Sequence, residues 1–224
     1  MAFEGCLEDY AFVAQSLLDL YEASFELEWL SMAQALTERM NHLFWDREAG
    51  GFFCSSGRDS SVLVRMKEEY DGAEPSGNSI ATLNLLRLAE MLDRPAWKQM
   101  AERTLTAFSQ RLNQHPHLMP QLLVALEFLW QSPVQIVIAG ERDDPLTQAL
   151  VRAVNQRFLP NKVLLLADRE VQSQLGAGLR WLAALSPRDN RPTAYVCRNF
   201  TCDQPVQAPE ALGELLARPG ASSG

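Results

Sequence analysis

Residues 71–92 read DGAEPSGNSIATLNLLRLAEML, in which a cluster of acidic, turn-forming and amide residues leads directly into a helix. Pro75 suits the first turn of a helix, and serine is a favoured residue at a helix start. From Ser76 to Leu92 the segment is rich in leucine and small residues. This composition predicts an inner helix that is surrounded by other helices.

A second inner helix is predicted at residues 8–24, which are apolar on nearly all sides and contain no glycine or proline. Each inner helix is followed by a segment whose apolar residues recur at steps of three and four, as expected for an outer helix that buries one face; these segments are 28–45 and 96–112. One more apolar helix is expected at about 118–130. Alternating inner and outer helices predict αα-hairpins of a helical toroid or solenoid, although two and a half hairpins cannot close a ring.

Two short strands are predicted between the first and second helix pairs, at 51–54 and 62–66, as a β-hairpin insert. Beyond Pro133 the pattern changes to apolar, β-branched runs at 134–139 and 162–167, which flank an amphipathic stretch. This order predicts a β-α-β unit with a parallel strand pair. A third strand at 193–197 and a closing helix at 209–217 complete the predicted C-terminal part.

The fold class expected from these patterns is mainly α. It combines αα-hairpins of an incomplete (α/α) toroid and a short β-hairpin insert with a small C-terminal α/β module; the six-hairpin form of the toroid is implied by the family resemblance described below. The expected domains are a partial toroid at 1–132, the α/β module at 133–217, and a disordered tail at 218–224.

Composition excludes several classes of partner. The net charge of −8 and the pI of about 5.0 repel phosphate backbones, and no stretch of Lys and Arg opposes this field, so nucleic acid is not expected as a partner. No apolar run reaches the roughly 18 residues that span a bilayer, and the first residues do not resemble a signal peptide. We therefore expect a cytoplasmic protein with no membrane partner.

The four cysteines are Cys6, Cys54, Cys197 and Cys202. A zinc site would require further ligands near the last two, and the three histidines lie far upstream, so neither a metal nor another cofactor is expected. In a reducing cytosol the cysteines are expected to be free thiols. A redox pair formed by Cys197 and Cys202 is the alternative to this interpretation.

The candidate site lies at the starts of the two inner helices. Loops at the N-terminal ends of inner helices line the central cleft of an (α/α) toroid, where free amide groups and helix dipoles meet a polar ligand. We predict Asp71 and Glu74 as catalytic residues, and Asp9, Tyr10 and Asn78 as substrate-binding residues. Two carboxylates in a cleft are what glycoside hydrolysis or sugar epimerisation needs, one as an acid and one as a base or nucleophile.

The alternative interpretation of these residues is structural. Acidic residues, serine and asparagine are favoured at helix N-termini, so helix capping explains each of them taken singly.

Several motifs together resemble one family: LEDYAFV at 7–13, LDLYEA at 18–23, DGAEPSGNS at 71–79, PNKV at 160–163, and YVC at 195–197 with Cys202. In this combination they resemble the C-terminal part of the spermatogenesis-associated protein 20 family, whose bacterial members are called thioredoxin-domain-containing proteins. The resemblance implies a six-hairpin toroid similar to those of N-acylglucosamine 2-epimerases and six-hairpin glycosidases. The chain has no Cys-x-x-Cys motif and is expected to lack the thioredoxin-like domain of that family.

The function expected from the resemblance is a part of a carbohydrate-handling, glycosidase- or epimerase-like cleft. Its partners would be a sugar-like small molecule and an N-terminal segment that completes the toroid. Two alternatives are a non-catalytic scaffold or interaction domain, and a fragment without independent activity.

Overall fold

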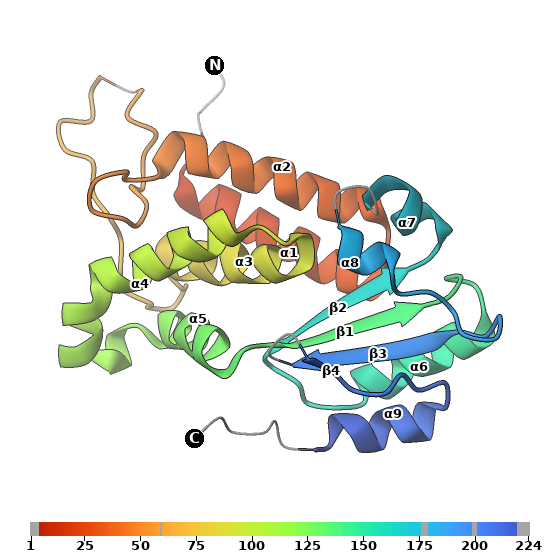
Figure 1. Cartoon of the computed structure of the whole chain (residues 1–224). Helices are drawn as coiled ribbons and strands as arrows, with labels where there is room; N and C mark the ends of the chain where they lie inside the picture. The colour runs from red at the N-terminus through yellow and green to blue at the C-terminus, as the bar shows by residue number, and fades with distance from the viewer. Residues whose placement is uncertain (1–4, 59, 176–178, 199–200, 219–224) are drawn as a thin grey trace. The chain divides into compact units, whose positions relative to one another are not determined.

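The computed structural model describes residues 5–58, 60–175, 179–198 and 201–218 (Figure 1). The chain divides into two compact units, Met1–Trp130 and Gln131–Gly224. All but the first residue of the predicted disordered tail at 218–224 lies outside the described residues. Among the helices described, none is long and apolar enough to cross a membrane.

The first unit is built from helices. They are α1 (Leu7–Ser24), α2 (Leu27–Phe44), α3 (Gly77–Leu92), α4 (Pro95–Gln114), the 3-10 helix η1 (Pro116–Leu118) and α5 (Pro120–Gln131). Helix α1 packs against both α2 and α3, and α3 packs against α4 (Figure 1). Together with the small sheet of the second unit, this confirms the prediction of a mainly helical chain.

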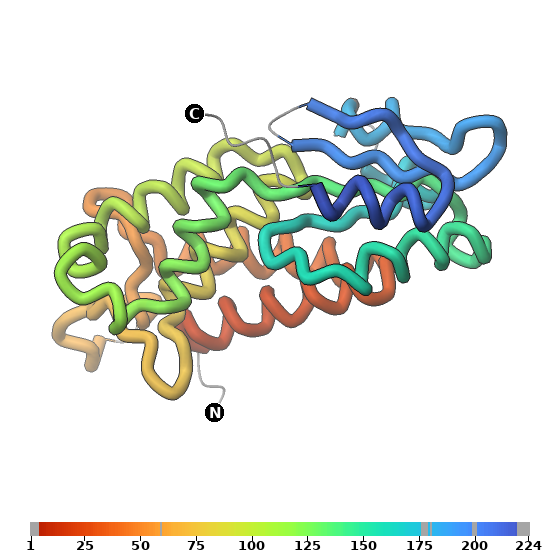
Figure 2. The backbone as a smooth tube through the Cα atoms, turned by 90° about the horizontal axis from the view of Figure 1, so that it is seen from below, coloured from red at the N-terminus to blue at the C-terminus, as the bar shows by residue number. Residues whose placement is uncertain are grey.

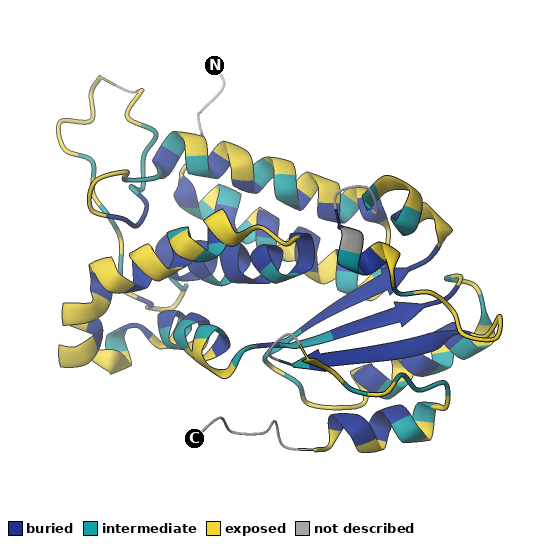
Figure 3. Ribbon diagram, in the orientation of Figure 1, coloured by how far each residue is buried: buried dark blue, intermediate teal, exposed yellow. Residues whose placement is uncertain are grey.

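Helix α3 is the buried centre of the first unit, with 14 of its 16 residues buried (Figure 3). Polar side chains of α3 bond to α1: the Asn84 amide donates to the Ala11 carbonyl oxygen at 2.8 Å, and Arg87 pairs with Asp19 at 2.7 Å. The prediction of burial on nearly all sides is therefore correct for α3.

The same prediction is wrong for α1. Its buried residues form one face, while Val13 is 50% exposed and Leu20 is 46% exposed. The reason is that α2 and α3 cover only part of the circumference of α1.

The predicted β-hairpin at 51–54 and 62–66 does not form as a pair of strands. The described part of this insert has an isolated bridge between Trp45 and Phe52 and one backbone hydrogen bond, from Cys54 N to Met66 O at 2.8 Å. Asn78 explains the difference, because its side-chain amide accepts from Phe52 N at 2.7 Å and donates to Phe52 O at 2.9 Å. The N–H and C=O groups of Phe52 are therefore already bonded and are not available to a partner strand.

The insert is held by two basic side chains that bond inward. Arg65 donates to Ser55 O at 2.6 Å and lies over the Phe53 ring at 4.1 Å. Lys67 forms an ion pair with Asp46 at 2.7 Å. The neighbouring apolar residues face solvent: Leu63 is 95% exposed, Val64 is 75% exposed and Met66 is 70% exposed.

The second unit contains the sheet. Its elements are β1 (Val134–Ala139), α6 (Pro145–Asn155), β2 (Lys162–Ala167), α7 (Arg169–Leu175), α8 (Arg180–Ala183), β3 (Thr193–Arg198), β4 (Thr201–Cys202) and α9 (Pro209–Leu216). The strand order is β2-β1-β3-β4, with β1 and β2 parallel and both other pairs antiparallel. The β-α-β unit expected from the sequence is present.

Successive residues of the three longer strands are buried, as expected for a sheet that is covered on both faces. Helices α6 and α9 lie side by side, with α6 against β1 and α9 against β3 (Figures 1 and 2). Asp144 caps the start of α6 by accepting from Leu146 N at 2.7 Å. The apolar runs that predicted the strands thus supply the core of this unit.

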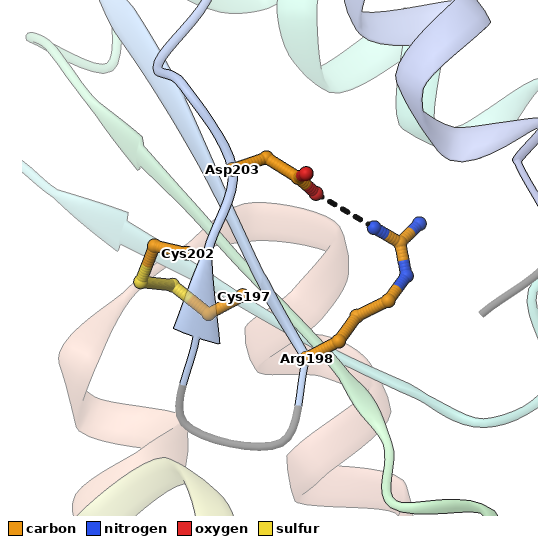
Figure 4. Close-up of a disulfide and its surroundings, with 4 residues drawn as sticks. All are labelled: Cys197, Arg198, Cys202 and Asp203. Carbon is orange, nitrogen blue, oxygen red and sulfur yellow. Dashed lines mark hydrogen bonds and ion pairs between the residues drawn. A yellow bond between two sulfur atoms is a disulfide. The ribbon is translucent and has the colours of Figure 1, made fainter. Parts of the chain in front are cut away.

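The expectation of free thiols at Cys197 and Cys202 is wrong. The two residues are direct partners across β3 and β4, and their sulfur atoms form a disulfide (Figure 4). The register of β3 and β4 places the two residues opposite each other. Cys6 and Cys54, in the first unit, are free.

Candidate functional site

The starts of α1 and α3 meet at one end of the first unit. A Cβ atom on Gly77 would lie 2.8 Å from Leu7 Cγ and 3.1 Å from a carboxylate oxygen of Glu8. Only glycine permits this approach. We call the residues around this contact, 6–10 and 71–78, the helix-start cluster; it contains all five of the site residues predicted from the sequence.

Asp71 is buried in the helix-start cluster and is 7% exposed. One carboxylate oxygen accepts from Ser76 N at 2.8 Å. The other accepts from Gln121 N at 2.8 Å and from Leu122 N at 3.2 Å, which are free backbone donors in the first turn of α5. Asp71 therefore joins the start of α3 to the start of α5.

Asn78 is also fully engaged with backbone groups. Besides its two bonds to Phe52, its amide nitrogen donates to Glu68 O at 2.9 Å. The side chain is 1% exposed, so it fastens both ends of the 52–68 insert to α3 from a buried position. In this arrangement its amide is not directed at a ligand.

The predicted residues on α1 have local contacts. The Asp9 carboxylate accepts from Cys6 N at 2.8 Å and from Cys6 Sγ at 3.2 Å, which is helix-start capping. The Tyr10 ring stacks edge to face on Phe44, with 5.3 Å between centroids, and remains partly exposed. Asp9 is exposed.

Glu74 differs from the other candidates. It is exposed, and within the described residues its carboxylate has no hydrogen-bond or ion-pair partner. Its backbone carbonyl accepts from Gly72 N at 3.0 Å, which closes the turn that carries it. A Cβ on Gly72 would lie 2.8 Å from the Tyr70 ring, so a larger residue at this position would displace the exposed Tyr70 side chain.

Two free thiols lie beside the same helix start, and sequence spacing gave no sign of this arrangement. Leu7 N donates to Cys54 O at 3.0 Å, which brings Cys54 next to the residue that follows Cys6. Burial raises the pKa of both thiols, and the negative charge of Glu8 raises both further. These thiols are therefore protonated at neutral pH and are weak nucleophiles.

The second unit has a groove of about 360 Å³ between α6 and α9. Its lining combines small residues with the charged residues Arg152, Arg157 and Glu210. Gly213 leaves room for Arg157, whose nearest guanidinium nitrogen is 3.1 Å from the position of an added Cβ.

Within the described ranges, no group of three or more His, Cys, Asp or Glu residues is arranged to hold a metal ion.

The similarity of this chain to known proteins extends over both units. No protein-family model matches the chain. Spermatogenesis-associated protein 20 of Homo sapiens is 44% identical over 213 residues, which are 95% of this chain and 27% of the human protein. The Mus musculus protein of the same name is 42% identical over 213 residues, which are again 95% of this chain and 27% of that protein. An uncharacterized protein of Caenorhabditis elegans is 36% identical over 211 residues, or 93% of this chain and 28% of that protein.

The chain thus spans about a quarter of the length of these curated relatives. By this similarity it belongs to the spermatogenesis-associated protein 20 family and matches a C-terminal part of those longer proteins.

Proposed function

We propose that the chain forms part of the wall of a carbohydrate-handling cleft in a six-hairpin (α/α) toroid, which the remaining length of the family proteins completes. The observation that carries this proposal is the meeting of two helix starts, α1 and α3, with Asp9, Tyr10 and Glu74 accessible at the same end. Helix starts provide free amide donors and a positive dipole end, which suit the hydroxyl and carboxylate groups of sugars.

The packing of the helices supports the toroid. Helices α1 and α3 lie against each other, and each also packs against the helix that follows it in the chain. In the proposed toroid α1 and α3 are the inner helices, and α2 and α4 are the outer ones. The exposed side chains of Val13 and Leu20 on α1 offer an apolar stripe to a preceding hairpin of the longer proteins.

Within this proposal the two carboxylates have different roles. Glu74 is the acid or base that contacts the sugar, because its carboxylate is accessible and has no partner among the described residues. Asp71 positions the loop that carries Glu74, because backbone amides of α3 and α5 occupy its oxygens. Asp9 and Tyr10 bind the sugar at the neighbouring helix start.

The test uses a complete family protein in which the residue matching Glu74 is changed to Gln. Binding and turnover of a panel of neutral and acylated sugars are measured by calorimetry and by product analysis. Turnover is expected to fall roughly a hundredfold or more, the usual contribution of a general acid or base. The matched control is Glu102→Gln on the exposed face of α4, which leaves turnover unchanged. Equal activity of the Glu74 variant and the parent on every accepted sugar would contradict the proposal.

A non-catalytic scaffold is the second candidate, and the bonding of Asp71 and Asn78 favours it. Both side chains are buried, and their bonds go to backbone groups. A scaffold predicts that changes in the helix-start cluster lower stability and leave ligand binding unaffected. Calorimetry of the Glu74 variant therefore separates the two functions, because Glu74 contributes no described side-chain contact.

A further inference from the structure

The disulfide between Cys197 and Cys202 lies at the edge of the sheet. Cys197 belongs to β3 and is 6% exposed, whereas Cys202 belongs to the two-residue strand β4, both of whose residues are exposed. The disulfide joins residues only five positions apart in the chain. One end of the bond is therefore accessible to solvent and the other belongs to the core of the second unit.

Besides the disulfide, β4 is held by its two-residue ladder with β3 and by contacts of the next residue, Asp203. Asp203 N donates to Val196 O at 2.9 Å, and the Asp203 carboxylate pairs with Arg198 at 2.9 Å (Figure 4). Arg198 also donates to Leu215 O, in the last turn of α9, at 3.3 Å. Further along, Ala194 and Val206 exchange two backbone hydrogen bonds of 2.8 and 3.0 Å, which do not depend on the disulfide.

The difference in exposure sets a direction for thiol–disulfide exchange. An incoming thiolate must approach a sulfur atom that it can reach, and access is one of the factors that govern the rate. Cys202 is an exposed residue and Cys197 a buried one, so Cys202 is the residue that an incoming thiolate reaches. The Cys197 sulfur is then the leaving group.

We propose that Cys197 and Cys202 form a reversible thiol–disulfide exchange site whose co-substrate is a small monothiol of the glutathione class, with Cys202 as the residue that forms the mixed disulfide. The thiolate of the small thiol attacks Cys202 Sγ, the protein disulfide breaks, and Cys197 leaves and takes up a proton from solvent. A second small thiol attacks the mixed disulfide and releases the Cys202 thiol and the oxidised small thiol. Two electrons pass from the two small thiols to the protein.

The structural consequence of exchange is local. Once the disulfide opens, β4 keeps only its two-residue ladder with β3 and the contacts of Asp203, while the Ala194–Val206 pairing keeps the following segment on the sheet. The reduced protein is therefore expected to release residues 201–203 from β3 and to retain the fold of the second unit.

The first experiment measures the exchange on the full chain with reduced and oxidised glutathione as the probe. The protein is equilibrated over a wide range of glutathione ratios, free thiols are blocked by alkylation, and peptides are mapped by mass spectrometry. We expect the Cys197–Cys202 pair to pass reversibly between oxidised and reduced forms within this range. A pair that stays fully oxidised, or fully reduced, at every ratio overturns the proposal.

The second experiment tests the direction of attack with single substitutions in a Cys6→Ser, Cys54→Ser background. Cys197→Ser leaves the exposed Cys202, and Cys202→Ser leaves the buried Cys197. With oxidised glutathione the first variant is expected to form a mixed disulfide about tenfold faster than the second, because access limits the rate. Equal rates overturn the assignment of Cys202. Circular dichroism checks that both variants are folded, and peptide mapping of the mixed disulfide on the parent chain supplies the same answer if either is not.

The third experiment measures amide hydrogen exchange in the oxidised and reduced forms. The amide of Asp203 is expected to lose protection on reduction, whereas the amide of Val206 keeps it. Loss of protection at both amides would show that the disulfide holds the whole edge of the second unit. Unchanged protection at both would show that the disulfide does not hold residues 201–203 on β3. Either result contradicts the local release.

Discussion

The Asp71 carboxylate accepts a hydrogen bond of 2.8 Å from the backbone of Gln121, fifty residues further along the chain. The same oxygen accepts from Leu122, and the second oxygen accepts from Ser76. One side chain thus satisfies backbone donors at the starts of two helices. This use of a buried carboxylate makes the loop around Glu74 part of the fixed structure of the first unit.

Removing the Asp71 carboxylate is predicted to destabilise the first unit. Asp71→Ala leaves the amides of Ser76, Gln121 and Leu122 without their acceptor, and the expected loss is about 3 kcal/mol of unfolding free energy. Chemical denaturation measures this loss. Glu74→Ala, in the same loop and without a described side-chain partner, is the control and should change the unfolding free energy by less than about 0.5 kcal/mol. A loss of equal size in the two variants would rule out the capping role.

Replacing Asn78 is predicted to release the 52–68 insert. Asn78→Ala removes all three side-chain bonds to Phe52 and Glu68 and should cost about 2 to 3 kcal/mol. Limited trypsin digestion should then cut after Arg58 faster than in the parent. The exposed Asn113 on α4 provides the control, because Asn113→Ala should leave the digestion rate unchanged. Unchanged digestion of the Asn78 variant would mean that other contacts hold the insert.

The ion pair of Lys67 with Asp46 predicts a pH dependence. The hydrogen bond from Lys67 is the main cause that lowers the pKa of Asp46 from 3.8 to about 2, and backbone amides of Ala49 and Glu48 lower it further. A carboxyl with a lowered pKa in the folded state stabilises the protein fully above its unfolded pKa and loses this contribution as the pH falls. The contribution of Asp46 should therefore decline between pH 3.8 and about 2.

Lys67→Met tests this assignment. The pKa of Asp46, followed by the carboxyl carbon shift in an NMR titration, should move up toward its ordinary value without reaching it, because the backbone donors remain. Lys98→Met, which changes a pair with Glu90 on other helices, should leave the Asp46 titration where it is. A pKa of Asp46 that ignores the loss of Lys67 would refute the stated cause.

Opening the Cys197–Cys202 disulfide is predicted to cost little stability. The bond closes a short loop, with a sequence separation of five, so the loop-entropy relation gives a loss of about 2 kcal/mol on reduction. Chemical denaturation with and without a reductant, followed by circular dichroism, measures this loss. The Cys197→Ser, Cys202→Ser variant should show no response to the reductant. Global unfolding of the second unit on reduction would contradict this prediction.

The sequence was a reliable guide where neighbouring residues act together. The leucine and small residues of α3 predicted its burial, and the apolar runs of β1 and β2 predicted a parallel pair, because each element buries a continuous stretch of its own side chains. Local periodicity is sufficient for such elements.

Prediction failed where a distant group takes over a backbone bond. Phe52 lies in a segment with strand character, but the Asn78 amide already occupies its donor and acceptor. The partner of Asp71 at Gln121 is equally invisible to spacing rules, because the two meet only after three helices have packed. Cys197 and Cys202 were expected to be thiols because their spacing alone does not show that they are direct partners across two paired strands.

The insert that Asn78 holds reverses the usual relation between residue type and exposure, and this bears on protein engineering. Arg65 and Lys67 look like replaceable surface residues in the sequence, yet both bond inward, whereas Leu63 looks like a core residue and is 95% exposed. A variant designed for high-concentration work should therefore exchange Leu63 and Val64 for polar residues and leave the two basic side chains untouched. A redesign guided by hydropathy alone would make the opposite choice and remove the anchors of the loop.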